Sequence, residues 1–303
     1  MYVIPLVAAI WVSLAPLQTA RQELAVAAAN GKVYAIGGIS GLNVLASVEE
    51  YDPASNRWRF VAPLPEPLHH SAAATLDDVI YVIGGYRTLA FDPADAVYRY
   101  DPRSDAWSKV APLPTARGAL AAATIDGRIF AVGGVPGGSL LSVYDPRTDR
   151  WTLFTPMPTG REHLAAAAAG GKLYVAGGRQ PQNVDAMEVY DPVTDQWREL
   201  PPLPTARSGI AAAAVNDRIY VFGGEGNRSS ASGVFAENES FDLATETWRS
   251  EAPMPTPRHG IGAAVVDGRI YIPGGAVVQG FGAANASEAF IVVEQPRRRA
   301  VRR

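Results

Sequence analysis

An arginine ends the same short phrase five times along this chain of 303 residues. The phrase is PLPTAR in two places, and close variants such as PMPTGR and PMPTPR occur in the others. A guanidinium group donates paired hydrogen bonds to a carboxylate or phosphate, so several arginines held together could bind an anion. The alternative is structural: each arginine bonds backbone carbonyls or a carboxylate of an adjoining element and fixes it. The arginines are Arg21, Arg117, Arg161, Arg207 and Arg258.

The four histidines lie just after the same position. His69 and His259 occupy the residue after it, and His70 and His163 occupy the next one. Imidazoles from alternate repeats could meet on a common axis and bind a metal ion. The gap between them is expected to be too wide for one ion, and histidine in a polar loop commonly binds none, so we predict no metal site.

Two carboxylates also lie beside the arginines. Glu23 follows Arg21, and Glu162 follows Arg161. A carboxyl group in such a place could act as a general acid or base. A surface salt bridge to the neighbouring arginine is the simpler expectation.

These residues belong to a repeat of 44 to 51 residues, which a pair of glycines marks at the end of a hydrophobic run. In five units an aromatic residue and an aspartate follow the glycines, and a tryptophan stands seven residues after the aromatic one. The glycine pairs begin at Gly37, Gly84, Gly133, Gly177, Gly223 and Gly274, and the tryptophans are Trp58, Trp107, Trp151, Trp197 and Trp248. A repeat of this length predicts a stack of small units that bury a shared core.

Each unit predicts four short antiparallel strands. An alanine-rich run, a tight turn such as Asn30-Gly31 and a β-branched run indicate a hairpin. The Glu-x-Tyr-Asp phrase supplies a third strand, and the tryptophan begins a fourth. Alanine on the first strand suits the crowded centre of a ring, so we expect a closed propeller.

The order of double glycine, Glu-x-Tyr and tryptophan resembles the Kelch repeat over nearly the whole chain. The resemblance implies an all-β, six-bladed Kelch propeller, which we place at residues 1–296. The arginine-rich residues 297–303 form a basic tail. The last unit lacks its tryptophan, but Trp11 stands five residues before a proline, as in the complete units. We therefore expect the strand at 10–15 to join the blade of 261–293 and close the ring.

Strand alternation places the longer loops on one side of the ring, which we call the long-loop face. These loops are 39–46, 86–95, 179–186, 225–237 and 276–286. Binding residues concentrate on dissimilar loops of a rigid scaffold. We therefore expect the five arginines and four histidines to bind a ligand around the mouth of the central channel on this face. Tolerated insertions are the alternative.

The composition excludes several kinds of chemistry. The chain has no cysteine, which excludes disulfides, thiolate metal sites and the Tyr-Cys copper site of Kelch oxidases similar to galactose oxidase. The Glu-x-x-x-Asp-x-x-x-His motif of the iron-binding Kelch specifier proteins does not occur. Kelch sialic-acid mutarotases need only acid/base groups and arginines, so a sugar mutarotase or epimerase stays the alternative. The resemblance itself does not imply a function, because Kelch propellers serve as adaptors, sugar-binding modules and, less often, enzymes. We expect a non-catalytic binding module without a cofactor, whose partner is a protein segment or an anionic small molecule such as a sugar.

Charge and hydropathy say little about the cellular compartment of the protein. The net charge of -3 gives no reason to expect nucleic-acid binding, and no stretch is long and apolar enough to span a membrane. The apolar first ten residues could form a signal-peptide core, but no lysine or arginine precedes them, and cleavage would remove the closing strand. We favour a cytoplasmic monomer over a secreted or periplasmic protein.

Overall fold

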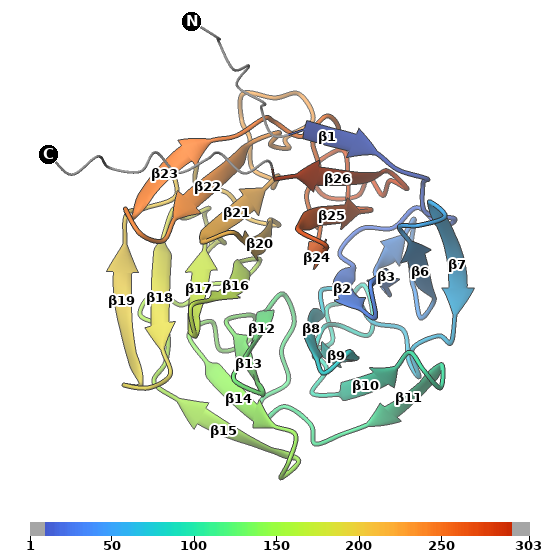
Figure 1. Ribbon diagram of the computed structural model, residues 1–303, viewed down its shortest axis with the longest axis horizontal. Coiled ribbons are helices and arrows are strands. Elements are labelled where there is room, and N and C mark those ends of the chain that lie inside the picture. The colour runs from blue at the N-terminus through green and yellow to red at the C-terminus, as the bar shows by residue number, and fades with distance from the viewer. Residues whose placement is uncertain (1–9, 293–303) are drawn as a thin grey trace, which may run out of the picture.

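Alanine-rich runs form the innermost strand of each sheet in the computed structural model, which describes residues 10–292. The strands converge on the axis of a ring, as Figure 1 shows, and small side chains allow this close approach. The innermost strands are β2 (Ala25–Ala29), β8 (Ala72–Leu76), β12 (Ala121–Ile125), β16 (Ala165–Ala169), β20 (Ala211–Val215) and β24 (Ala264–Val266).

Tight turns lead from each innermost strand to the second strand of its sheet. At the first of these turns Asn30 and Gly31 have φ angles of 49° and 70°, the left-handed conformation that a two-residue hairpin requires. The second strands are β3 (Lys32–Ile36), β9 (Val79–Ile83), β13 (Arg128–Val132), β17 (Lys172–Ala176), β21 (Arg218–Phe222) and β25 (Arg269–Pro273).

The third and outermost strands complete six four-stranded antiparallel sheets, the blades. The third strands are β6 (Val48–Asp52), β10 (Val97–Asp101), β14 (Leu141–Asp145), β18 (Met187–Asp191), β22 (Asn238–Asp242) and β26 (Ser287–Ile291). The outermost strands are β7 (Arg57–Val61), β11 (Ala106–Lys109), β15 (Arg150–Phe154), β19 (Gln196–Leu200), β23 (Thr247–Ser250) and β1 (Ile10–Ser13). A small hairpin of β4 (Ile39–Ser40) and β5 (Asn43–Val44) stands on the loop of the first blade.

The ring closes through the N-terminal strand. β1 pairs antiparallel with β26, and Trp11 lies opposite Phe290. The prediction of a six-bladed propeller closed by the Trp11 strand is therefore confirmed. The segments 1–9 and 293–303 lie outside the described residues, so the signal-like start, the basic tail and the expected domain limits stay predictions.

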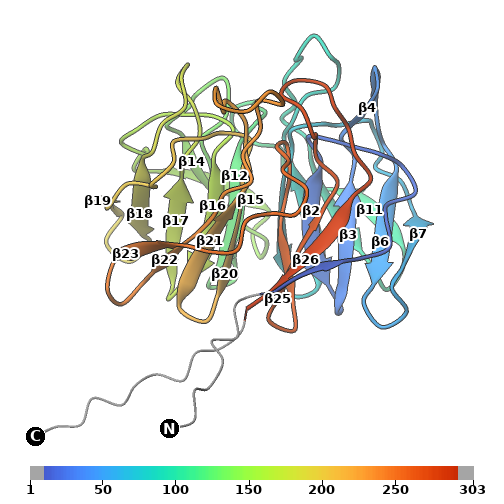
Figure 2. The ribbon, with the colours of Figure 1, turned by 90° about the horizontal axis from the view of Figure 1, so that it is seen from above.

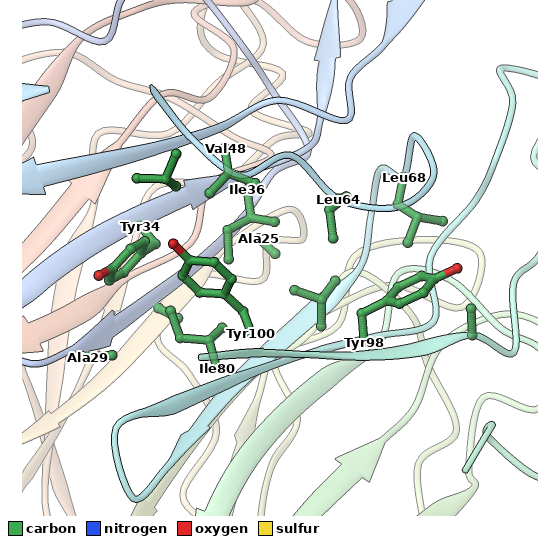
Figure 3. Packing of buried hydrophobic residues seen from close by; sticks show 14 of the residues in the cluster. Ala25, Ala29, Tyr34, Ile36, Val48, Leu64, Leu68, Ile80, Tyr98 and Tyr100 are labelled. Carbon is green, nitrogen blue, oxygen red and sulfur yellow. The ribbon is translucent and has the colours of Figure 1, made fainter. Parts of the chain in front are cut away.

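Each repeated tryptophan fastens its blade to the preceding one. The indole Nε1 donates to a backbone carbonyl just after the outermost strand of the neighbouring blade, at 2.8 to 2.9 Å. Trp151, for example, donates to Ala111. The core lies between blades, and Figure 3 shows Tyr34 and Val48 of the first blade packing with Ile80 and Tyr100 of the second.

The two faces of the ring differ in the length of their loops. Figure 2 shows long loops on one face and short hairpin turns on the other. Among the described residues, no helix is long and apolar enough to cross a membrane. The fold thus leaves the long-loop face, around the axis, as the place where side chains of different blades can meet.

Candidate functional site

The five repeated arginines lie inside the blades and do not ring the channel mouth. Their exposed fraction is 0 to 1%, which makes the expectation of an accessible arginine ring wrong. Each guanidinium group bonds backbone carbonyls of its own blade, and four of the five also pair with a glutamate on the third strand. These pairs are Arg21–Glu49, Arg161–Glu188, Arg207–Glu239 and Arg258–Glu288.

Arg207 shows the arrangement. Its Nε donates to the carbonyl of Gly223 at 2.8 Å, and its Nη2 donates to the carbonyl of Val221 at 3.0 Å. Glu239 accepts from Nη1. A buried charge needs such partners, and these contacts are those of the structural alternative, in which the arginine fixes the blade.

Arg117 departs from this pattern because the third strand of its blade carries Ser142 in place of glutamate. Its Nη2 donates to Ser142 Oγ at 3.1 Å and to the Ala131 carbonyl at 3.0 Å. Within the described part of the chain, Nε and Nη1 have no hydrogen-bond partner. Burial lowers the pKa of Arg117 to about 10.

The residues two positions after the arginines meet on the axis. The backbone N–H of each bonds the carbonyl of its counterpart in the preceding blade at 2.8 to 2.9 Å, which gives a closed ring of six hydrogen bonds. We call these residues the axis ring, and they are Glu23, His70, Ala119, His163, Gly209 and Gly260. The ring removes the wide channel that the sequence led us to expect at this level.

All six axis-ring residues adopt left-handed backbone, with φ between 50° and 66°. Glycine takes this conformation without strain. At Gly260 it also makes room, because a Cβ there would lie 2.4 Å from Oε1 of Glu23. The glycine positions thus leave the axis open for the side chains of the other blades.

The structure brings the four histidines together at this point. The ring centroids of His69 and His70 are 4.7 Å apart, and those of His70 and His163 are 4.9 Å apart. His259 Nδ1 lies 3.5 Å from Glu23 Oε1. Histidines from three blades therefore surround the carboxylate of a fourth.

The two predicted acid/base candidates have partners other than those expected. Glu23 Oε2 lies 3.3 Å from His70 Nε2. Glu162 pairs with His163 at 3.0 Å and with Arg179 at 2.7 Å. The expected salt bridges to Arg21 and Arg161 are wrong because each of those arginines is engaged inside its blade.

Sequence reasoning missed Arg179, Glu225 and Tyr86. Each directly follows a glycine pair and forms an antiparallel bridge with the residue before an axis-ring residue. Arg179 links two blades, because its Nη1 donates to Glu225 at 2.6 Å while its Nε donates to Glu162. Their signal in the sequence is the shared position directly after the glycine pair, which recurs in every repeat.

Burial and charge shift the titration of this cluster. Burial holds the pKa of His70 well below its ordinary value, and the neighbouring histidines and Arg179 lower it further. Burial also raises the pKa of Tyr86 to about 12. Burial alone would raise the pKa of Glu162. Hydrogen bonds and charges from His163 and Arg179 outweigh this effect and lower the pKa to about 2. At neutral pH the cluster therefore combines a neutral imidazole with a firmly ionised carboxylate.

A cavity of about 70 Å³ lies on the axis, lined by the axis ring and the residues that follow it. It is large enough for a few water molecules or a small ion. A larger depression of about 410 Å³ lies on the third blade around Arg128, Asp145 and Phe154, away from the histidines. His70, whose pKa is held well below its ordinary value, lines the axial cavity.

Comparisons with known proteins agree with this architecture. A family model described as the Kelch motif matches residues 20–65, 67–114 and 206–255, and a KLHDC2/KLHL20/DRC7 Kelch-repeats domain matches residues 112–224. The fold and the repeated residues define a Kelch-type propeller. The chain belongs to the Kelch-repeat family.

Among curated relatives, the Kelch-like protein terF from Aspergillus terreus is 31% identical over 89% of this chain. The chain spans 53% of the length of that protein. Kelch-like protein 35 from Mus musculus is 43% identical over 25% of this chain, which spans 13% of its length. A solved structure, that of YjhT, has a TM-score of 0.77 and 18% identity, and the similarity covers 93% of this chain and 97% of that one. The last likeness supports the fold.

Proposed function

We propose that this propeller, as a binding module of the Kelch type, holds a protein segment across its long-loop face, over the mouth of the axial cavity. Kelch propellers act generally as interaction modules. One observation carries the finer proposal: exposed apolar side chains stand on the loops of four successive blades. They are Leu42, Phe91, Val135, Val277, Val278 and Phe281. Apolar side chains gathered on one face of a soluble protein mark an interaction surface.

These loops adjoin the histidine cluster. The ring of Phe91 lies 5.7 Å from the ring of His70 and 5.2 Å from that of Tyr86. The carbonyl of Val278 accepts from His259 Nε2 at 3.0 Å. An apolar rim and a polar floor are therefore continuous, as in protein interfaces that combine apolar anchors with a few oriented polar groups.

The charge at the mouth favours a neutral or basic segment over an anionic ligand. Glu23, Glu162 and Glu225 contribute three carboxylates, whereas Arg179 is the cation that bridges two of them. The five repeated arginines are buried inside the blades, where they bond backbone carbonyls and, in four cases, a glutamate. An anionic sugar would therefore meet more carboxylates than cations.

The alternative of a sugar mutarotase or epimerase requires a group that both gives and takes a proton. Glu162, with a pKa of about 2, carries no proton to give at neutral pH. The other candidate, Glu23, is enclosed between His70 and His259. On these grounds we propose a module without catalysis. Anomerisation of sialic acid in the presence of the protein, followed by NMR, is expected to proceed at the uncatalysed rate.

Selection of a random peptide library on the immobilised full chain tests the binding surface. A selected peptide is expected to lose at least about 10-fold in affinity for Phe91→Ser and for Phe281→Ser, since each change removes a buried apolar contact. Val193→Ser is the matched control, because Val193 is 90% exposed on a turn of the opposite face. Equal affinity for all four proteins, or a loss confined to Val193→Ser, would contradict the proposal.

A further inference from the structure

The hydrogens of the histidine cluster can be placed from its contacts. His69 Nε2 lies 2.9 Å from the carbonyl oxygen of Thr88, so Nε2 carries a hydrogen and donates it. In a neutral ring His69 Nδ1 is then an acceptor. His70 Nδ1 lies within hydrogen-bond distance of that atom and must donate to it. This relay fixes the tautomer of His70 and leaves its Nε2 without a hydrogen.

His70 Nε2 faces Oε2 of Glu23 at 3.3 Å. Both atoms are acceptors when Glu23 is a carboxylate, and the exposed fractions of the His70 and Glu23 side chains are 6% and 10%. Two lone pairs that face each other in a buried site repel unless something positive lies between them. The gap therefore calls for a cation or for an additional proton.

We propose that Glu23, His70 and His163 bind a divalent transition-metal ion of the zinc class at the axis of the propeller. One ligand atom from each of these residues lies within 4.8 Å of the others. Two imidazoles and one carboxylate are a donor set that zinc accepts, with water in the remaining position. The axial cavity of about 70 Å³ offers room for that water.

The spacing between His70 and Glu23 fits this coordination. Two bonds of about 2.1 Å at a tetrahedral angle place ligand atoms about 3.4 Å apart. The separation of 3.3 Å between His70 Nε2 and Glu23 Oε2 matches this value without movement of the backbone. The axis ring of hydrogen bonds, which holds both backbones in place, explains why residues of different blades reach one ion.

Both histidines also have the outer partners that orient a metal ligand. His70 donates to His69, which donates in turn to the Thr88 carbonyl. His163 Nδ1 lies 3.0 Å from a carboxylate oxygen of Glu162, which leaves Nε2 as the ring nitrogen that can bind the ion. Carboxylate and carbonyl partners of this kind fix the ring and strengthen it as a donor.

One contact has to be exchanged. Nη2 of Arg179 lies 3.3 Å from His163 Nε2, and binding of the ion replaces this contact. Arg179 keeps Glu162 and Glu225, at 2.7 and 2.6 Å, so it stays neutralised. The ion would link the first, second and fourth blades, independently of any segment bound on the long-loop face.

Titration of the chelator-treated chain with ZnCl2, and with CoCl2 as a spectroscopic probe, tests the site. The expected results are one ion per chain, d–d absorption bands of a tetrahedral N/O site with Co²⁺, and a melting temperature that rises with ZnCl2 concentration. Glu23→Gln, His70→Asn and His163→Asn should each weaken binding by at least about 100-fold, and His69→Phe by about 10- to 100-fold, since His69 only orients a ligand.

Glu246→Gln is the control, because this exposed glutamate pairs with Arg198 on an outer turn and should leave binding unchanged. Wild-type protein that binds neither ion, or variants that bind as the wild type does, would overturn the site. The Co²⁺ spectrum of the wild type decides the matter even if one variant fails to fold. Peptide binding measured with chelator present reports on the proposed function separately.

Discussion

Two positions that stand only two residues apart in every repeat differ in almost every respect. The arginine position is nearly constant, and its side chain is buried inside the blade. The axis-ring position varies among glutamate, histidine, alanine and glycine, and its side chain faces the common axis. The backbone of both positions is held by hydrogen bonds between blades.

The difference separates residues that stabilise the scaffold from residues that line the axis. The arginine recurs in five of the six blades and is buried inside each of them, so it serves the scaffold. The axis-ring residue varies among the blades, although its backbone conformation is the same in all six. Its side chain is therefore not needed to build any one blade. We therefore expect substitutions of the repeated arginines to lower stability, and we propose the unlike side chains of the axis ring as binding residues.

Removal of the closing strand tests the scaffold most severely. Deletion of residues 1–15 removes β1, which pairs with β26, and leaves the third strand of the last blade as an open edge. We expect aggregated or partly unfolded protein without a cooperative transition. Size-exclusion chromatography and a calorimetric scan check this, and a monomer that melts at the wild-type temperature would refute the closure.

The comparison of the two positions predicts unequal costs of substitution. Arg207→Ala leaves the buried carboxylate of Glu239 without its cation, so we expect a loss of about 3 to 5 kcal/mol in the free energy of unfolding. His70→Ala borders the axial cavity, where water can replace the ring, and should cost only about 1 kcal/mol. Urea unfolding of both variants, with chelator present, measures the contrast. Similar losses would mean that the axis ring is as structural as the arginines.

The repeated tryptophans offer a milder test of the same rule. Trp151→Phe keeps the aromatic contact with Tyr144 but removes the hydrogen bond to Ala111, for an expected loss of about 1 to 2 kcal/mol. Trp248→Phe is the control, because its hydrogen bond to Pro201 is exposed and water can substitute. Thermal unfolding should rank Trp151→Phe clearly below Trp248→Phe, and the reverse order would contradict the assigned role.

The fold could be predicted from the sequence because its signals are local and repeated. The double glycines, the aromatic–aspartate phrase and the tryptophan spacing each recur at a fixed offset, and Trp11 revealed the closing strand by the same offset. The histidine positions likewise indicated that side chains of several blades could meet. The axis-ring hydrogen bonds narrow the centre of the ring, but they could not be predicted from residue types because backbone groups form them.

The sequence left the structural and the ligand-binding role of the arginines open because their partners lie on another strand. Arg21 and Glu49 are 28 residues apart, and the pairing emerges only when both positions are compared across the repeats. The second blade supplies the signal: where Leu68 replaces the arginine, Tyr98 of the same blade fills the space on the third strand, and both pack in the core that Figure 3 shows.

The third blade allows the smallest but most specific test. Arg117 is buried, yet Ser142 stands where Glu188 and Glu239 serve the equivalent arginines of other blades. Ser142→Glu places a carboxylate within reach of Nε and Nη1 of Arg117, which have no partner among the described residues. Because the desolvation of the new carboxylate offsets part of the ion pair, we expect a gain of about 1 kcal/mol.

The unfolding midpoint in urea measures this gain, and Ser142→Gln separates charge from size. Glutamine adds similar volume and one acceptor without neutralising the guanidinium group, so its gain should be smaller. Combined with Arg117→Leu, the glutamate loses its cation and should become destabilising, because it is then a buried and unpaired charge. A gain in the free energy of unfolding that persists in the Arg117→Leu background would show that the glutamate acts through packing. The pairing of arginine and glutamate seen in the other blades would then not explain the stability of the third blade.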